Sequence, residues 1–244
     1  MFKAGAHFAF NKSRRHPSVA PFIFGAKNKV EIFDLEKTSV LLESAKEFVK
    51  KAGMEGKQML IVGGKSEARA AVRNAGELLG MPFVDGRWLG GTLTNFKEIR
   101  KRVEKFERLL SEREKGELAK YTKKERLLID REITKLDRFF SGIVSMKDLP
   151  KIVFIVDPKR EYTAVKEAED MNIPVVSLAG SDCDVSKIKH PVIGNDSSKT
   201  SIEFFVHEII QAYTEGKIAA PKAAPLPAPA TASATHGAPI SATK

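Results

Sequence analysis

Apolar residues along the chain follow two repeating patterns, and together these are typical of an alternating α/β protein. Continuous apolar runs at 59–62 and 152–156, with shorter ones at 30–35, 82–84, 174–178 and 191–193, predict short strands. Apolar residues three and four positions apart predict helices over about 37–51, 66–79, 162–170 and 201–213. Because the longer runs lack polar alternation, we expect a parallel sheet buried by helices on both sides.

A segment with a different rhythm interrupts this alternation. From Phe96 to Leu110, and again from Ile129 to Ile143, apolar residues recur alternately three and four positions apart. Gly116 lies in the break, and Thr122 with Glu125 forms a capping box that restarts the helix. The pattern predicts an inserted antiparallel helical hairpin, a coiled coil whose two apolar seams face each other. Its many charged residues favour a hairpin that projects from the α/β body.

These patterns divide the 244 residues into four parts. The last part consists mainly of Ala, Pro, Ser and Thr and has no aromatic residue, so it cannot form a core. The predicted division is a basic N-terminal arm (1–29), an α/β domain (30–95 and 144–216), an inserted helical hairpin (96–143) and a disordered Ala/Pro-rich tail (217–244).

Composition limits the class of protein. The single cysteine, Cys183, excludes an intramolecular disulfide framework and a multi-cysteine zinc site, and it suits a reducing compartment. No apolar run is long enough to cross a membrane, and the first ten residues do not form a signal sequence. We therefore expect a soluble, cytoplasmic protein with no membrane partner.

The net charge of +10 is unevenly distributed. Residues 1–29 contain six basic side chains and no acidic one, and residues 97–138 contain 15 basic against 10 acidic. Localised positive charge favours a polyanionic partner such as RNA or DNA, although a basic terminus can also be a solvated tail. Phe8, Phe10, Phe22 and Phe24 lie between the charges, so we expect the arm to pack on the protein while presenting its cations.

Four short motifs resemble parts of enzyme or metal sites. Gly63-Gly64-Lys65-Ser66 ends like a phosphate-binding Walker loop, but Met59 stands where that loop needs glycine, which favours a tight strand-to-helix turn. His207-Glu208 lacks the second zinc-binding histidine, because Gln211 occupies its place. Ser181 to Asp184 and Asp157-Pro158 are interpreted mainly as turns, with cation binding left open for Ser181 to Asp184.

The sequence thus predicts no catalytic residue, no cofactor and no metal site. An alternative stays open, in which the chain is a flavodoxin-like enzyme acting on a phosphorylated small molecule. In that case Gly63 to Ser66 and Asp157 would line a cleft at the carboxyl ends of the strands.

Several blocks resemble the bacterial small-subunit ribosomal protein S2 family. They are Ala4 to Phe8, Phe22 to Val30, Leu35 to Thr38, Arg87 to Asn95 and Gly194 to Asp196. The resemblance implies a flavodoxin-like domain with an inserted antiparallel coiled coil. It also implies a structural role in translation, as a protein that binds ribosomal RNA between the head and body of the small subunit and helps to hold the large messenger-RNA-binding ribosomal protein. A metal role for a second histidine does not carry over, because Phe10 stands at that position.

Candidate RNA-binding residues follow from the charge pattern. In the arm, cationic side chains can neutralise phosphates, and at 87–88 a guanidinium stands beside the only tryptophan, which either stacks on a base or anchors the core. Cations at the base of the hairpin either bind phosphate or pair with Glu98 and Glu104. The candidates are Lys12, Arg14, Arg15, Lys27, Lys29, Arg87, Trp88, Lys97, Arg100, Lys101 and Arg102.

Overall fold

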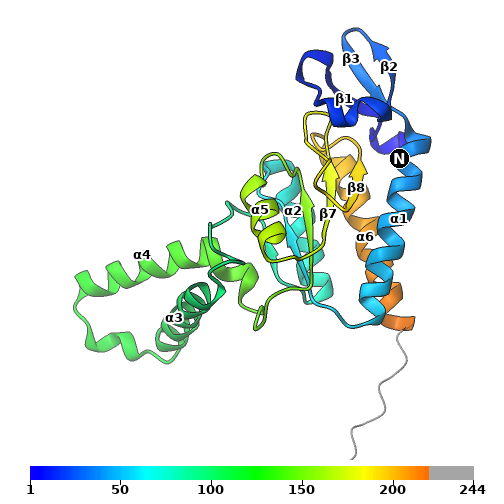
Figure 1. The fold of residues 1–244 in the computed structure, drawn as a ribbon. Helices are drawn as coiled ribbons and strands as arrows, with labels where there is room; N and C mark the ends of the chain where they lie inside the picture. Colours follow the sequence, from blue (N-terminus) through cyan, green and yellow to red (C-terminus); the bar gives the residue numbers. More distant parts are fainter. Residues whose placement is uncertain (220–244) are drawn as a thin grey trace, which may run out of the picture.

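A computed structural model describes residues 1–219 and contains a five-stranded parallel sheet (Figure 1). The strands are β4 (Met59–Val62), β5 (Phe83–Val84), β6 (Ile152–Val156), β7 (Val175–Ala179) and β8 (His190–Ile193), in the spatial order β5-β4-β6-β7-β8. Every neighbouring pair is parallel. After β5 the chain crosses back over β4 to start β6, so the direction of winding reverses between β4 and β6. The predicted parallel sheet is confirmed.

Helices cover both faces of this sheet, as the absence of polar alternation predicts. In β4, Met59 and Ile61 pack on one face with the helices α1 (Leu35–Met54), α2 (Ser66–Leu79) and α6 (Lys199–Ala219). Leu60 and Val62 point to the other face and join α5 (Tyr162–Asp170) and part of the inserted segment. The two faces therefore form separate apolar clusters on a sheet that is buried throughout.

Helix α6 is longer than predicted. It runs to Ala219 and includes residues 217–219, which the sequence pattern assigns to the tail. The rest of the predicted Ala/Pro-rich tail, from residue 220, lies outside the described residues.

The inserted segment contains two helices, α3 (Phe96–Glu114) and α4 (Lys123–Phe140), followed by the short 3-10 helix η5 (Ser141–Ile143). Gly116 adopts a left-handed conformation after α3, and the 3-10 helix η4 (Glu117–Lys120) leads to the predicted capping box of Thr122 and Glu125. The two helices extend away from the sheet (Figure 1) and are bridged by Lys105 and Glu132. A supercoiled arrangement of the pair stays a prediction.

The first 33 residues form a second, smaller sheet. Strands β1 (Phe8–Asn11), β2 (Ile23–Lys27) and β3 (Val30–Phe33) pair antiparallel in the order β1-β3-β2, and the 3-10 helices η1 (Phe2–Ala4), η2 (Lys12–Arg14) and η3 (Pro17–Phe22) surround them. The predicted strand at 30–35 therefore exists, but assigning it to the α/β domain was wrong. A tight turn at Asn28 and Lys29 folds it back onto the arm instead.

Candidate nucleic-acid interface

The arm is fixed to the carboxyl edge of the parallel sheet. The Phe10 amide donates to Ser181 Oγ at 3.0 Å, and Asn195 Nδ2 donates to the Gly5 carbonyl at 2.9 Å. Val19 is buried together with Cys183, which follows β7. The expectation that the arm packs while presenting its cations is met, because backbone and apolar contacts hold it in place while Lys12 and Arg14 remain exposed.

The turn between β2 and β3 presents two lysines. Lys27 is the last residue of β2, and Lys29 lies in the turn with a φ of 66°, next to Asn28 with a φ of 51°. Positive φ at both central positions is the geometry of a two-residue hairpin turn, which matches the twist of the flanking strands. Lys12, Lys27 and Lys29 are exposed, and none forms an ion pair with a carboxylate of residues 1–219.

The two arginines of the arm differ from these lysines. Arg14 Nη2 lies 3.4 Å from Asp182 Oδ2, and its guanidinium stacks on the Phe10 ring at 4.2 Å, yet its side chain stays mostly exposed. Arg15 forms a 2.8 Å ion pair with Glu31, which is buried. Arg15 therefore holds β3 against the arm, and its guanidinium is less available to phosphate than the sequence pattern suggests.

The structure answers the open question about Trp88. The side chain is only 6% exposed, and its Nε1 donates to Glu167 Oε1 at 3.0 Å. It packs in the apolar cluster that joins the sheet to the inserted helices. Base stacking by Trp88 is contradicted by this burial, and the core-anchor interpretation is correct. Its neighbour Arg87 remains exposed.

Glu167 organises the loop around Trp88, and the sequence did not identify it. One carboxylate oxygen accepts from the Trp88 indole and from the Gly91 amide, and the other accepts from the Leu93 amide at 2.9 Å and from Thr94. A buried glutamate on α5 thus fixes the turn that leads into α3. The only sequence signal was an acidic residue among the apolar positions of a helix.

At the base of α3, two of the four candidate cations contact carboxylates of residues 1–219 and two do not. Lys101 pairs with Glu98 at 2.7 Å, and Arg100 contacts Glu104 and the Val144 carbonyl, as the alternative of pairing within the hairpin predicts. Lys97 and Arg102 are exposed and form no ion pair within the described part of the chain. The candidates thus come from two parts of the chain, the arm and the residues around the start of α3, and these elements lie apart in Figure 1.

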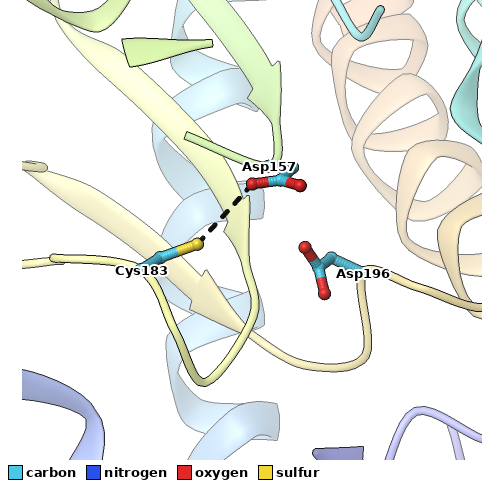
Figure 2. A group of neighbouring side chains, drawn as sticks. All are labelled: Asp157, Cys183 and Asp196. Carbon is cyan, nitrogen blue, oxygen red and sulfur yellow. Dashed lines mark hydrogen bonds between the residues drawn. The ribbon is translucent and has the colours of Figure 1, made fainter. Parts of the chain in front are cut away.

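Side chains that follow β6, β7 and β8 meet around Lys65, which itself follows β4. Its Nζ lies 3.1 Å from Asp157 Oδ2, after β6, and 3.1 Å from Asp196 Oδ2, after β8. Figure 2 shows Cys183 beside these carboxylates, with its thiol 3.8 Å from Asp157 Oδ1. Asp157, Cys183 and Asp196 could together ligate a cation. The Lys65 ammonium already bridges the two carboxylates, however, so the cluster carries its own positive charge.

The electrostatics of this cluster are set by burial. Burial raises the pKa of Asp196 to about 6, and Asp157 adds to this rise while Lys65 opposes it. Burial and the adjacent Asp157 raise the pKa of the Cys183 thiol to about 12, so the thiol stays protonated and donates. Lys65 therefore pairs with both acids. It does not extend into an open phosphate site, as a Walker lysine would.

The remaining motifs have structural roles. Asp182 Oδ2 accepts from Lys159 at 2.8 Å, and Asp184 Oδ1 accepts from the Ser186 amide at 3.0 Å, as expected for a turn. His207 is exposed on α6, and it is absent from the metal-ligand cluster found in the described residues. Across residues 1–219, no helix has the length and apolar character needed to span a membrane.

Comparison with known proteins agrees with this arrangement. The family model for ribosomal protein S2 matches residues 1–216. Small ribosomal subunit protein uS2 of Coprothermobacter proteolyticus is 40% identical over 217 residues, covering 89% of this chain and 81% of the relative. The protein of the same name from Sulfurimonas denitrificans is 41% identical over 217 residues (89% and 84%), and that from Dictyoglomus thermophilum is 38% identical over 226 residues (93% and 92%). The chain therefore belongs to the ribosomal protein S2 family.

Proposed function

We propose that this chain binds small-subunit ribosomal RNA through the exposed cations of its arm and of the base of α3. As a member of its family it is a structural, non-enzymatic constituent of the small ribosomal subunit. The observation that carries the RNA-binding proposal is the placement of Lys27 and Lys29. Both are exposed and unpaired within the described residues, on a turn whose backbone is fixed by three paired strands.

Fixed, unpaired lysines suit a phosphate backbone. Each contact with a phosphate releases condensed counterions, so affinity falls as salt rises. Lys12 and Arg14 extend the positive charge along the arm, and within residues 1–219 Arg14 pairs with one carboxylate, that of Asp182 at 3.4 Å. Contacts of this kind position a protein on folded RNA without reading bases, so we expect recognition of RNA shape.

A second contact region lies near the root of the inserted helices, where Lys97, Arg102 and Arg87 are exposed. Because α3 lies well apart from the strands of the arm in Figure 1, we infer that the RNA touches the protein at two places. The chain would then divide into a basic arm and an inserted hairpin, which contact RNA, and an α/β domain, which holds them in place. We also expect neighbouring small-subunit proteins as partners, the large messenger-RNA-binding one among them.

The enzyme alternative has little support from the strand ends. Its two candidate groups, Lys65 and Asp157, pair with each other, and Lys65 also pairs with Asp196. An ammonium shared between two carboxylates is not free to bind a substrate phosphate.

The proposal is tested by sedimenting the protein from gently lysed cells on sucrose gradients, at low and high salt, with and without ribonuclease. We expect the protein to migrate with the small ribosomal subunit and to leave it after ribonuclease treatment. A double variant, Lys27→Gln with Lys29→Gln, should dissociate at lower salt than the wild-type protein.

The matched control is Lys51→Gln with Lys166→Gln, which removes the same charge from exposed positions on α1 and α5. It should dissociate at the wild-type salt concentration. A wild-type protein that sediments free of the subunit and ignores ribonuclease would refute RNA binding. Equal dissociation of the two double variants would show that the arm is not the contact.

A further inference from the structure

Four arginines surround one cavity at the carboxyl edge of the parallel sheet. The cavity has a volume of about 550 Å³, and Gly64, Trp88, Gly90, Glu161 and Thr163 also line it. Its arginines come from four separate segments: Arg69 from α2, Arg87 from the loop after β5, Arg138 from the end of α4, and Arg160 from the loop after β6. The fold thus gathers four guanidinium groups at the point where the direction of winding reverses, which is the usual ligand position in open α/β sheets.

These arginines are not neutralised by the described protein. None of the four forms an ion pair with a carboxylate of residues 1–219, and all four are exposed. By contrast, Arg73, one turn further along α2, donates two hydrogen bonds to Asp85 at 2.9 and 2.6 Å. Arg73 thus has a carboxylate partner, whereas the four arginines of the cavity have none within residues 1–219.

One acidic side chain, Glu161, lines the cavity, and its carboxylate is already engaged. Its Oε1 accepts from the Gly64 amide at 3.2 Å, and burial raises the pKa of this carboxyl. The cavity therefore keeps a clear excess of positive charge. The amino end of α2, which begins at Ser66 directly after Lys65, adds the partial positive charge of unpaired amide groups.

We propose that this cavity binds a phosphate group, and that the backbone of the ribosomal RNA supplies it. The inference rests on the proposed function and extends the contact region near α3, with which it shares Arg87, to Arg69, Arg138 and Arg160, which are not among the candidates from the charge pattern. A guanidinium group can donate two parallel hydrogen bonds to the oxygens of one phosphate, whereas a lysine ammonium acts as a point charge. A cavity lined by four arginines therefore suits a phosphate group better than one lined by four lysines would. Trp88 lines the cavity, but it is only 6% exposed and its Nε1 is hydrogen-bonded to Glu167, so it contributes little surface for stacking on a base.

An adjoining cavity favours a strand of RNA over a small free anion. It has a volume of about 620 Å³ and shares Arg69 and Arg138 with the first. Two adjoining cavities with shared arginines provide a path along which consecutive phosphates can lie. A single inorganic phosphate would occupy only one of them.

The test compares Arg69→Gln with Arg160→Gln, made together in the full chain, against Arg126→Gln. Arg126 is exposed on α4, about 18 Å along the helix from Arg138 at 1.5 Å per residue. Affinity for the small-subunit ribosomal RNA is measured at several salt concentrations. The double variant should bind about 10-fold more weakly, and the slope of log affinity against log salt should fall by about 1. Arg126→Gln should change the affinity by no more than about twofold and leave the salt slope close to that of the wild type.

Competition by inorganic phosphate and by adenosine monophosphate separates the two sources of the anion. If either saturates the cavity while the RNA affinity of the double variant equals that of wild type, the site takes a small phosphate and the RNA source is wrong. If the double variant and Arg126→Gln have equal RNA affinities and salt slopes, and no phosphate binding is lost, the cavity is not a phosphate site. A wild-type protein that fails to bind the RNA overturns the proposed function, while phosphate binding lost in the double variant would still establish the anion site.

Discussion

Glu167 shows how much of the local structure can depend on one side chain. Replacing it with Ala removes the acceptor for donors of Trp88, Gly91, Leu93 and Thr94. Because the donors of the buried residues Trp88 and Leu93 would be left without a charged partner, we expect the free energy of unfolding to fall by about 3 kcal/mol. Trp88 is the only tryptophan, so its fluorescence should shift to longer wavelength as the loop opens.

The control for this variant is Glu169→Ala on the same helix. Glu169 is exposed and faces Lys187 at 3.9 Å, so its loss should change the free energy of unfolding by less than about 0.5 kcal/mol. Urea unfolding and emission spectra of both variants measure the difference. Unchanged stability and emission in Glu167→Ala would show that the loop is held by packing alone.

Asp196 gives the protein a defined dependence on pH. Its pKa is raised by burial from 3.8 to about 6, so the folded state binds a proton more tightly than the unfolded state does. The contribution of this group to stability is therefore fully present below about pH 4 and is lost as the pH rises through about 6. In Asp196→Asn this loss should disappear.

Unfolding free energies of wild type and Asp196→Asn, measured between pH 4 and 7, check this expectation. The advantage of the wild type over the variant should shrink as the pH rises across this range. A difference that stays constant or grows would mean that the Lys65 ammonium outweighs burial and holds Asp196 ionised.

Whether a candidate side chain is free to bind RNA depends on partners that are distant in sequence. Arg15 pairs with Glu31, and Trp88 bonds to a glutamate 79 residues away. Charge and spacing identify which residues are basic or aromatic and mark a basic segment at 1–29, although the sheet formed by this segment extends to Phe33. They cannot predict which cations have a carboxylate within 4 Å, because the fold brings those carboxylates from other segments.

Among the elements, the β2–β3 turn combines an unfavourable backbone conformation with an exposed cation. A lysine in the left-handed region costs about 1 kcal/mol relative to glycine. Lys29→Gly should therefore raise the free energy of unfolding by up to about 1 kcal/mol, while it lowers affinity for ribosomal RNA a few-fold. Thermal unfolding and RNA titration of the same preparation measure both changes.

Asn28→Gly is the matched change in the neighbouring turn position, with a φ of 51°. Asparagine tolerates this conformation well and carries no charge, so both quantities should change little. If Lys29→Gly binds RNA as tightly as Asn28→Gly does, the lysine makes no contact with phosphate.

Elements were predicted most successfully where the periodicity was strong. The helices and the five parallel strands follow from apolar spacing, and the capping box at Thr122 from its two residues. The strand at Val30–Phe33 was assigned to the wrong sheet, because apolar spacing reports burial and does not report which strand is the neighbour. A turn between the two strands is compatible with the sequence Lys27-Asn28-Lys29-Val30, because asparagine tolerates the positive φ that a two-residue hairpin turn requires.

For the whole molecule, the insertion divides the sheet between two stretches of chain. Strands β4 and β5 precede α3 and α4, whereas β6, β7 and β8 follow them. Brief trypsin treatment of the native protein should cut first, within the described residues, between Lys115 and Lys124, where exposed lysines flank η4 far from the sheet. Because β4 pairs with β6, the two fragments should remain together during size-exclusion chromatography.

Denaturing electrophoresis of the same sample should show two fragments where the column shows one species. Fragments that separate on the column would mean that the insertion itself holds the two halves together. First cuts in the arm would mean that its contacts with Ser181 and Asn195 are weaker than the structure indicates.

The attachment of the arm has a consequence for protein synthesis. Phe10 is held by Ser181 and Gly5 by Asn195, so 171 and 190 residues separate the partners. The ribosome must translate β7 and β8 before the arm can dock, and until then its lysines lie on a chain without a fixed shape. A nascent chain that has not yet reached Asn195 therefore lacks a docked arm. If the arm binds RNA as proposed, we expect such a chain to compete poorly for a place in a new subunit.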